Sequence, residues 1–115
     1  MKIVFHIDDQ RRWSQLFGNL HHMIEAKKEL VPDLSVALVA TGNAVQPIVA
    51  QSATEEFKKE VAQLAKEGIA FNACHQSLLK FSIQPEEILN EFQVVPYGVI
   101  ALAEYQDKGY RYIKP

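Results

Sequence analysis

Cysteine is nearly absent from this sequence, with Cys74 the only one among 115 residues. One thiol cannot form an intrachain disulfide, and such sparse use of cysteine is typical of a reducing compartment. No apolar run approaches the roughly 20 residues that a membrane-spanning helix needs. Strand-like residues begin at Lys2, which leaves no room for a signal peptide. We therefore expect a cytoplasmic protein that does not bind membranes.

An excess of charge of either sign is also missing. The 12 Lys and Arg residues and 14 Asp and Glu residues give a formal net charge of −2. Binding to nucleic acid through phosphates requires a basic surface, so no nucleic-acid partner is expected. Residues 41–43 lack the glycine spacing of a nucleotide-binding loop. The histidines and the one cysteine have no recognised metal-ligand spacing, so we expect neither a metal nor a cofactor.

Strand and helix patterns alternate about five times along the chain, and the length fits one domain, residues 1–115. The expected strands are residues 2–7, 34–40, 69–73, 94–95 and 110–113. Amphipathic spacing predicts helices that begin near residues 13, 53, 75, 85 and 96, the second with a capping box from Ser52 to Glu55. Such alternation predicts an α/β fold, with helices on both faces of a mainly parallel five-stranded sheet.

Ligands of open α/β sheets bind beyond the carboxyl ends of the strands. Three predicted loops meet at that edge: residues 8–12, residues 41–44 and the turn at Cys74. If Cys74 lies where a strand passes into a helix, the first amides of the helix point toward its sulfur and favour a thiolate. His75 and the pair Arg11-Arg12 could add positive charge there.

Each candidate also has a plainer interpretation. Free cysteine is among the most often buried residues, so Cys74 could be a small hydrophobe that ends a strand. Asp8 and Asp9 could act as a base or bind a cation, but we favour capping of the helix that begins near Arg11. Gly42 and Asn43 predict a tight turn that lets the backbone approach something small.

Several segments resemble one known family. They are KIVFHIDD at the start, GNLHHMI in the first helix, ATGNAVQPI after the second strand, NACHQSL around the cysteine, and the closing VVPYGVIALAEYQDKGYRYIKP. The chain resembles the DsrE/DsrF-like family of small α/β proteins that are associated with intracellular sulfur transfer. It is most similar to a stand-alone branch of that family.

The resemblance implies a three-layer α/β/α sandwich and homo-oligomers, commonly trimers or hexamers. In sulfur-relay members a cysteine after the third strand carries a persulfide, and Cys74 matches that place. The family's pocket lies near this cysteine, so the resemblance makes Gly42 and Asn43 its expected neighbours.

Two functions follow as hypotheses. The first is a sulfur carrier that holds a persulfide on Cys74 and exchanges it with a donor or acceptor protein or with a small thiol. The alternative is a homo-oligomeric module that binds a small ligand or a protein without thiol chemistry.

Overall fold

The computed structural model describes all 115 residues and confirms the α/β fold. Five strands form one sheet in the order β4-β3-β2-β1-β5, and every neighbouring pair is parallel. The strands are β1 (Lys2–Ile7), β2 (Ser35–Ala40), β3 (Ala70–Cys74), β4 (Phe92–Val95) and β5 (Arg111–Ile113). The helices are α1 (Trp13–Glu29), α2 (Glu55–Lys66), α3 (His75–Lys80) and α4 (Gly98–Asp107), with short 3-10 helices η1 (Gln10–Arg12), η2 (Gly42–Ile48) and η3 (Pro85–Glu87).

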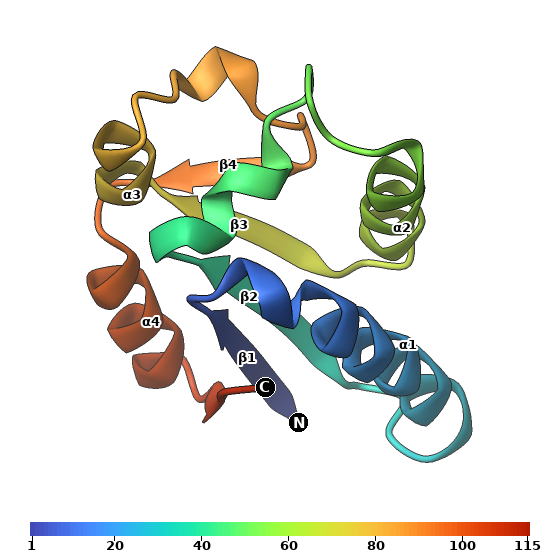
Figure 1. The fold of residues 1–115 in the computed structure, drawn as a ribbon. Helices are drawn as coiled ribbons and strands as arrows, with labels where there is room; N and C mark the ends of the chain where they lie inside the picture. Colours follow the sequence, from blue (N-terminus) through green and yellow to red (C-terminus); the bar gives the residue numbers. More distant parts are fainter.

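The strand order explains how the helices are divided between the two faces of the sheet. From β1 to β4 each connection steps in one direction, so right-handed crossovers place their helices on the same face. The last connection, from β4 to β5, runs back across the sheet and places α4 on the opposite face (Figure 1). The hydrophobic core is divided accordingly, into a cluster of 22 buried residues and a cluster of five that includes two residues of α4.

Trp13 anchors the larger core beside the carboxyl edge of the sheet. Its side chain is 4% exposed, and its ring packs at 5.2 Å from that of Phe57 and 6.2 Å from that of Phe92. Its indole N–H donates to the carbonyl of Ala44 at 2.9 Å. Because Ala44 belongs to η2, this bond fixes the loop that follows β2 against the start of α1.

Several elements depart from the sequence prediction: β4 begins two residues earlier than expected, the segment at Pro85 forms only the 3-10 helix η3, and the start of α2 differs. Helix α2 is capped by Thr54, whose hydroxyl accepts from the amide of Phe57 at 3.1 Å. The predicted capping box from Ser52 to Glu55 is therefore wrong, because Ser52 lies in a turn closed by its own amide on the carbonyl of Val49.

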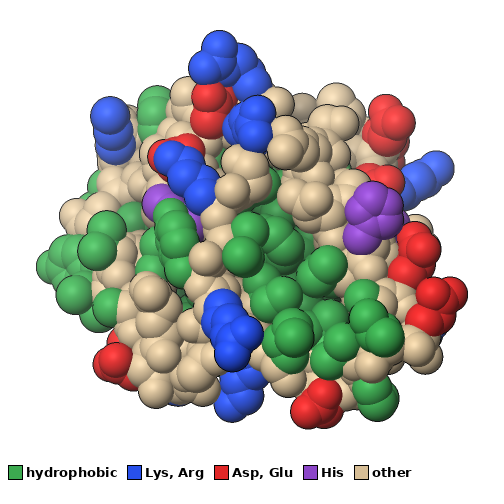
Figure 2. Space-filling view, turned by 90° about the horizontal axis from the view of Figure 1, so that it is seen from below, with side chains coloured by type: hydrophobic (Ala, Val, Ile, Leu, Met, Phe, Trp, Pro, Cys, Tyr) green, Lys and Arg blue, Asp and Glu red, His purple; other side chains and the backbone are tan.

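The α4 side of the molecule is only partly covered. Val99 is 75% exposed, and Tyr97 and Ile100 beside it are exposed as well. Figure 2 views the molecule from below, with hydrophobic side chains across the middle of this view and at its left edge, the side on which α4 lies in Figure 1. None of the helices is both long and apolar enough to cross a membrane.

Candidate functional site

Cys74 is the last residue of β3 and the N-cap of α3, with extended backbone angles. The alternation of the strand decides which way it faces. Phe71 and Ala73 belong to the larger core, whereas the side-chain amide of Asn72 donates to the hydroxyl of Tyr105 in α4 at 2.9 Å. Cys74, two residues after Asn72, therefore faces α4.

The sulfur of Cys74 lies at the start of a second helix as well. The backbone N–H of Gly98 donates to Sγ at 3.2 Å, and Gly98 is the first residue of α4. The first amides of a helix have no partner within the helix, and they carry its partial positive charge. The N-termini of α3 and α4 thus meet at one sulfur atom.

Only glycine fits at the start of α4. A Cβ at position 98 would lie 2.6 Å from Cγ2 of Thr41, 3.1 Å from Cβ of Cys74 and 3.3 Å from its sulfur. The first of these distances is a clash, and the other two are tighter than ordinary contacts. Gly98 therefore lets the helix amide come within hydrogen-bond distance of the thiol.

Ser77, in the first turn of α3, supplies a further donor. Its hydroxyl oxygen accepts from the amide of Gly42 at 2.8 Å, and its side chain lies close enough to Cys74 to lower the pKa of the thiol. Because the oxygen accepts from Gly42, the hydroxyl proton is free for donation to another group. Ser77 and Asn72 are the two buried polar residues of the protein. Ser77 lies near the thiol of Cys74, and Asn72 lies two residues before Cys74 in β3.

Burial and hydrogen bonds act in opposite directions on the Cys74 thiol, which is 6% exposed. Burial raises its pKa, whereas hydrogen bonds from the Ser77 side chain and from the amides of Ser77, Gly98 and Gln76 lower it. The net pKa lies below the ordinary value of the thiol. The protein thus favours a thiolate by aiming fixed dipoles at the sulfur.

The cations expected from the sequence do not act on this sulfur. Arg11 folds back on Asp9, with which it forms an ion pair at 2.8 Å, and its side chain is 84% exposed. Arg12 faces a separate pocket, and His75, although next to Cys74, is not among the groups that shift its pKa. Backbone amides and one hydroxyl, and not these cations, lower the pKa of the thiol.

The loops after β1 and β2 converge as predicted. Gly42 adopts a left-handed φ of +57°, and a Cβ there would lie 3.1 Å from the carbonyl oxygen of Asp8. Asn43 accepts from the amide of Gln10 at 2.8 Å, which joins the two loops. Gly42 therefore reaches the thiol through Ser77, whereas Asn43 holds the loops together.

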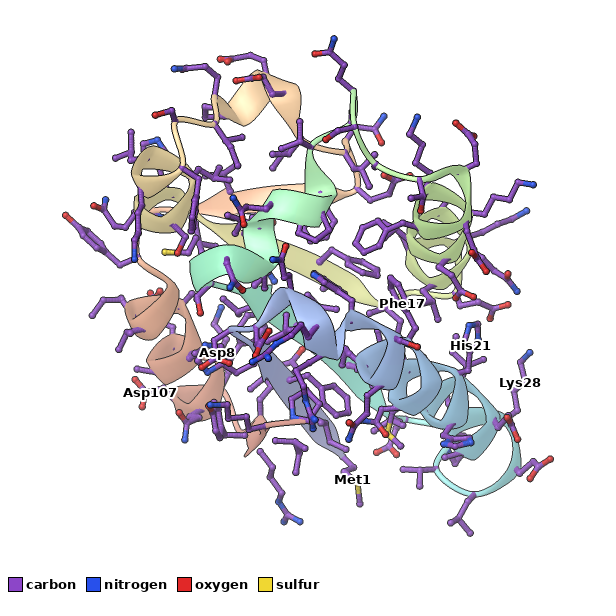
Figure 3. The ribbon with its side chains drawn as sticks, in the orientation of Figure 1. Met1, Asp8, Phe17, His21, Lys28 and Asp107 are labelled. Atoms are coloured by element: carbon purple, nitrogen blue, oxygen red, sulfur yellow. The ribbon has the colours of Figure 1, made fainter.

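The paired aspartates have different partners. Asp9 caps η1 by accepting from the amide of Arg11 at 2.9 Å, which confirms the capping interpretation for this residue. The hydrogen bonds from Arg11 hold the pKa of Asp9 at about 2. Asp8 instead forms an ion pair with Lys114 at 3.0 Å. In Figure 3, Asp8 lies between α4 and the start of α1.

A pocket of about 280 Å³ opens at this position. Its lining residues are His6, Ile7, Asp8, Asp9, Arg12, Lys114 and Pro115. Nδ1 of His6 lies 2.7 Å from the hydroxyl of Tyr112, and Nε2 lies 2.9 Å from Oγ1 of Thr41. Burial is the largest cause of the lowered pKa of His6, while Asp8 opposes it and Lys114 adds to it.

A larger hollow, of about 460 Å³, lies between α1 and α2 on the other face of the sheet. Phe17 and His21 line it, and Figure 3 shows both on the side of α1 that faces α2. Cys74 does not line this hollow, so volume alone does not locate the thiol chemistry. No group of three or more His, Cys, Asp or Glu side chains is placed to hold a metal ion.

Sequence reasoning missed Ser77 and Gly98 as neighbours of the thiol, and it gave Thr41 no role beyond its place in the loop of residues 41–44. A signal for Gly98 was present in the segment Pro96-Tyr97-Gly98, since a glycine at the start of a predicted helix indicates a close approach of the backbone. Ser77 had no such signal, because a serine in the first turn of a helix is common.

Comparison with known proteins agrees with this architecture. A structure of the protein of unknown function MTH1491 from Methanobacterium thermoautotrophicum superposes with a TM-score of 0.86 at 26% identity, over 99% of this chain and 98% of that one. The ychN protein from E. coli gives a TM-score of 0.76 at 16% identity, over 100% and 99% of the two chains. BT1422 from Bacteroides thetaiotaomicron, also of unknown function, gives a TM-score of 0.74 at 16% identity, over 99% of this chain and 94% of that one.

No curated protein matches the sequence. A family model, that of the DsrE/DsrF-like family, matches residues 2–115. Because this model covers nearly the whole chain, the chain belongs to the DsrE/DsrF-like family.

Proposed function

We propose that the protein is a cytoplasmic sulfur carrier that holds a persulfide on Cys74. The observation that carries the proposal is the hydrogen bond from Gly98 to Sγ, at a point where two helices begin. Membership of a family associated with sulfur relay supports it. The chemistry requires a nucleophilic sulfur in a shielded place, and it requires no metal.

In the loading step, the thiolate of Cys74 attacks the outer sulfur of a persulfide donor, R–S–SH. The S–S bond of the donor breaks, a new S–S bond forms on Cys74, and R–S⁻ leaves. In the unloading step, an acceptor thiolate attacks the outer sulfur of Cys74–S–SH and restores the Cys74 thiolate. Each step exchanges one S–S bond for another, so neither needs an oxidant or a reductant.

The surroundings of the sulfur suit both steps. Hydrogen bonds from Gly98 and Ser77 stabilise the thiolate, which is the attacking group in loading and the leaving group in unloading. Because Cys74 is the only cysteine, no internal thiol can discharge the persulfide into a disulfide. Burial of the side chain limits attack by unselected thiols.

Intact-mass spectrometry after incubation with inorganic polysulfide tests the proposal. We expect the wild-type protein to gain the mass of one sulfur atom and to lose it on reduction. The matched control is Cys74→Ser, which keeps the size of the side chain and should gain nothing. If the wild type gains no sulfur, or if the serine variant gains as much, the carrier function is wrong.

A homo-oligomeric binding module without thiol chemistry is the second candidate, and the exposed side chains of α4 favour it. Tyr97, Val99 and Ile100 form an apolar surface beside Gly98, suited to burial against copies of the chain in a trimer or hexamer. Light scattering of the wild type and of Val99→Asp tests the assembly. Alkylation of Cys74 against pH separates the two functions, because a pure binding module has no need of a reactive thiol.

A further inference from the structure

We propose that the pocket lined by His6, Asp8, Arg12 and Lys114 binds the carboxylate of a small thiol, of about dipeptide to tripeptide size, that exchanges sulfur with Cys74. This inference rests on the proposed carrier function and names its low-molecular-weight partner. Three features carry it: the position of the pocket relative to the sulfur, the guanidinium of Arg12, which forms no ion pair, and the size of the pocket.

The pocket and the thiol lie at the same edge of the sheet, where the strands end. Ile7, Ala40 and Ala73 are register partners in β1, β2 and β3, so the residues that follow them lie side by side at the carboxyl edge. Those residues are Asp8, Thr41 and Cys74. Two strand spacings place the backbone of Asp8 about 10 Å from that of Cys74.

Thr41 occupies the space between the pocket and the thiol. Its hydroxyl lies 2.9 Å from Nε2 of His6, a lining residue of the pocket. Its methyl group lies against Gly98, whose amide binds the sulfur. The side chain of Thr41 thus separates the pocket from the sulfur, and both lie at the carboxyl edge of the sheet.

The charges of the pocket favour an anion. Asp8 is paired with Lys114, and Asp9 is paired with Arg11, which lies outside the lining. Arg12 takes part in none of the ion pairs of the protein. Its guanidinium lowers the pKa of Asp9 through charge alone, without a direct ion pair, and its planar donors match a carboxylate.

Size and reach limit the ligand to a small molecule. A volume of about 280 Å³ lies at the lower end of the range for small-molecule sites. An extended chain covers about 3.3–3.6 Å per residue, so two or three residues span the distance from the pocket to Cys74. A peptide-like thiol with a carboxylate at one end and its sulfur near the other meets both requirements.

The binding experiment uses S-methylglutathione, which cannot exchange sulfur, and the Cys74→Ser protein. We expect NMR shift changes at residues of the pocket and an affinity that falls about two- to fivefold in Arg12→Gln. Arg111→Gln is the matched control, because Arg111 is exposed, forms no ion pair and lies outside the pocket. The difference should shrink in 1 M salt. Equal affinities of the two arginine variants, or no binding at all, would overturn the inference.

The transfer experiment uses Cys74 loaded from inorganic polysulfide and follows the loss of sulfur by mass. Arg12→Gln should slow unloading by glutathione by a similar factor and leave unloading by uncharged 2-mercaptoethanol unchanged. Normal loading with no effect of Arg12→Gln on glutathione would refute the pocket and leave the carrier function standing. Failure to load, with Arg12-dependent binding of S-methylglutathione intact, would refute the carrier function and leave the pocket as a carboxylate site.

Discussion

Replacing Gly98 with alanine tests the contact on which the site depends. The new Cβ would lie 2.6 Å from Cγ2 of Thr41, well inside the distance that two carbon atoms tolerate. Thr41 cannot simply rotate away, because its hydroxyl is held at 2.9 Å from His6. The start of α4 must therefore move outward, and the amide of residue 98 moves away from the sulfur of Cys74.

Two effects of this change can be measured. Overpacking of a buried contact costs about 1–3 kcal/mol, so the free energy of unfolding should fall by that amount. Loss of the amide donor should raise the pKa of Cys74, so alkylation at neutral pH should slow. Urea unfolding followed by Trp13 fluorescence gives the first quantity, and the iodoacetamide rate against pH gives the second.

A second substitution shows whether the Thr41 methyl group is the cause. Thr41→Ser removes Cγ2 and keeps the hydroxyl that contacts His6, so in the Gly98→Ala background it should restore part of the lost stability. The coupling free energy of the double-mutant cycle should be at least about 0.5 kcal/mol. Additive effects would show that the clash lies elsewhere.

Gly18→Ala is the control for replacing glycine as such. Gly18 lies inside α1, and nothing comes within 4 Å of a Cβ built there. Alanine at this position should stabilise the protein by about 0.5–1 kcal/mol and leave alkylation unchanged. If Gly98→Ala behaves in the same way, the close approach of the α4 amide is not what activates the thiol.

Three further predictions concern neighbouring residues. Ser77→Ala removes a donor to the sulfur, so the pKa of Cys74 should rise; an unchanged pH dependence of alkylation would contradict this. Tyr105→Phe deprives buried Asn72 of a partner at 2.9 Å and should lower the free energy of unfolding by about 1 kcal/mol in urea, with alkylation unaffected. The lowered pKa of His6 means that the unfolded chain binds a proton more readily, so stability should decrease as the pH falls from about 6.5 through the lower pKa of the folded state. Urea unfolding across this pH range should show that decrease in the wild type and a smaller one in His6→Gln.

Local patterns were sufficient for the elements and for the position of the cysteine. The apolar run of residues 2–7 has the bounds of β1, and the break before the next helix places Cys74 at the end of β3, because both depend on neighbours within a few residues. The all-parallel pairing likewise follows from the alternation of strands and helices.

The groups that contact the thiol could not all be predicted from such local patterns. Gly98 is 24 residues from Cys74, and the two meet only because the last crossover returns over the sheet. The contact expected between Arg11 and the thiol is absent for a local reason. Arg11 forms an ion pair with Asp9, two residues away, which holds its side chain outside the site. Sequence distance therefore concealed the donor Gly98.

The late position of α4 in the chain has a consequence for how the protein matures. Because residues 98–107 follow every strand except β5, a nascent chain that has completed only β1 to β4 carries Cys74 without the Gly98 amide. Its thiol then lacks one of the donors that lower its pKa. The surroundings of the sulfur are completed only when the final crossover docks.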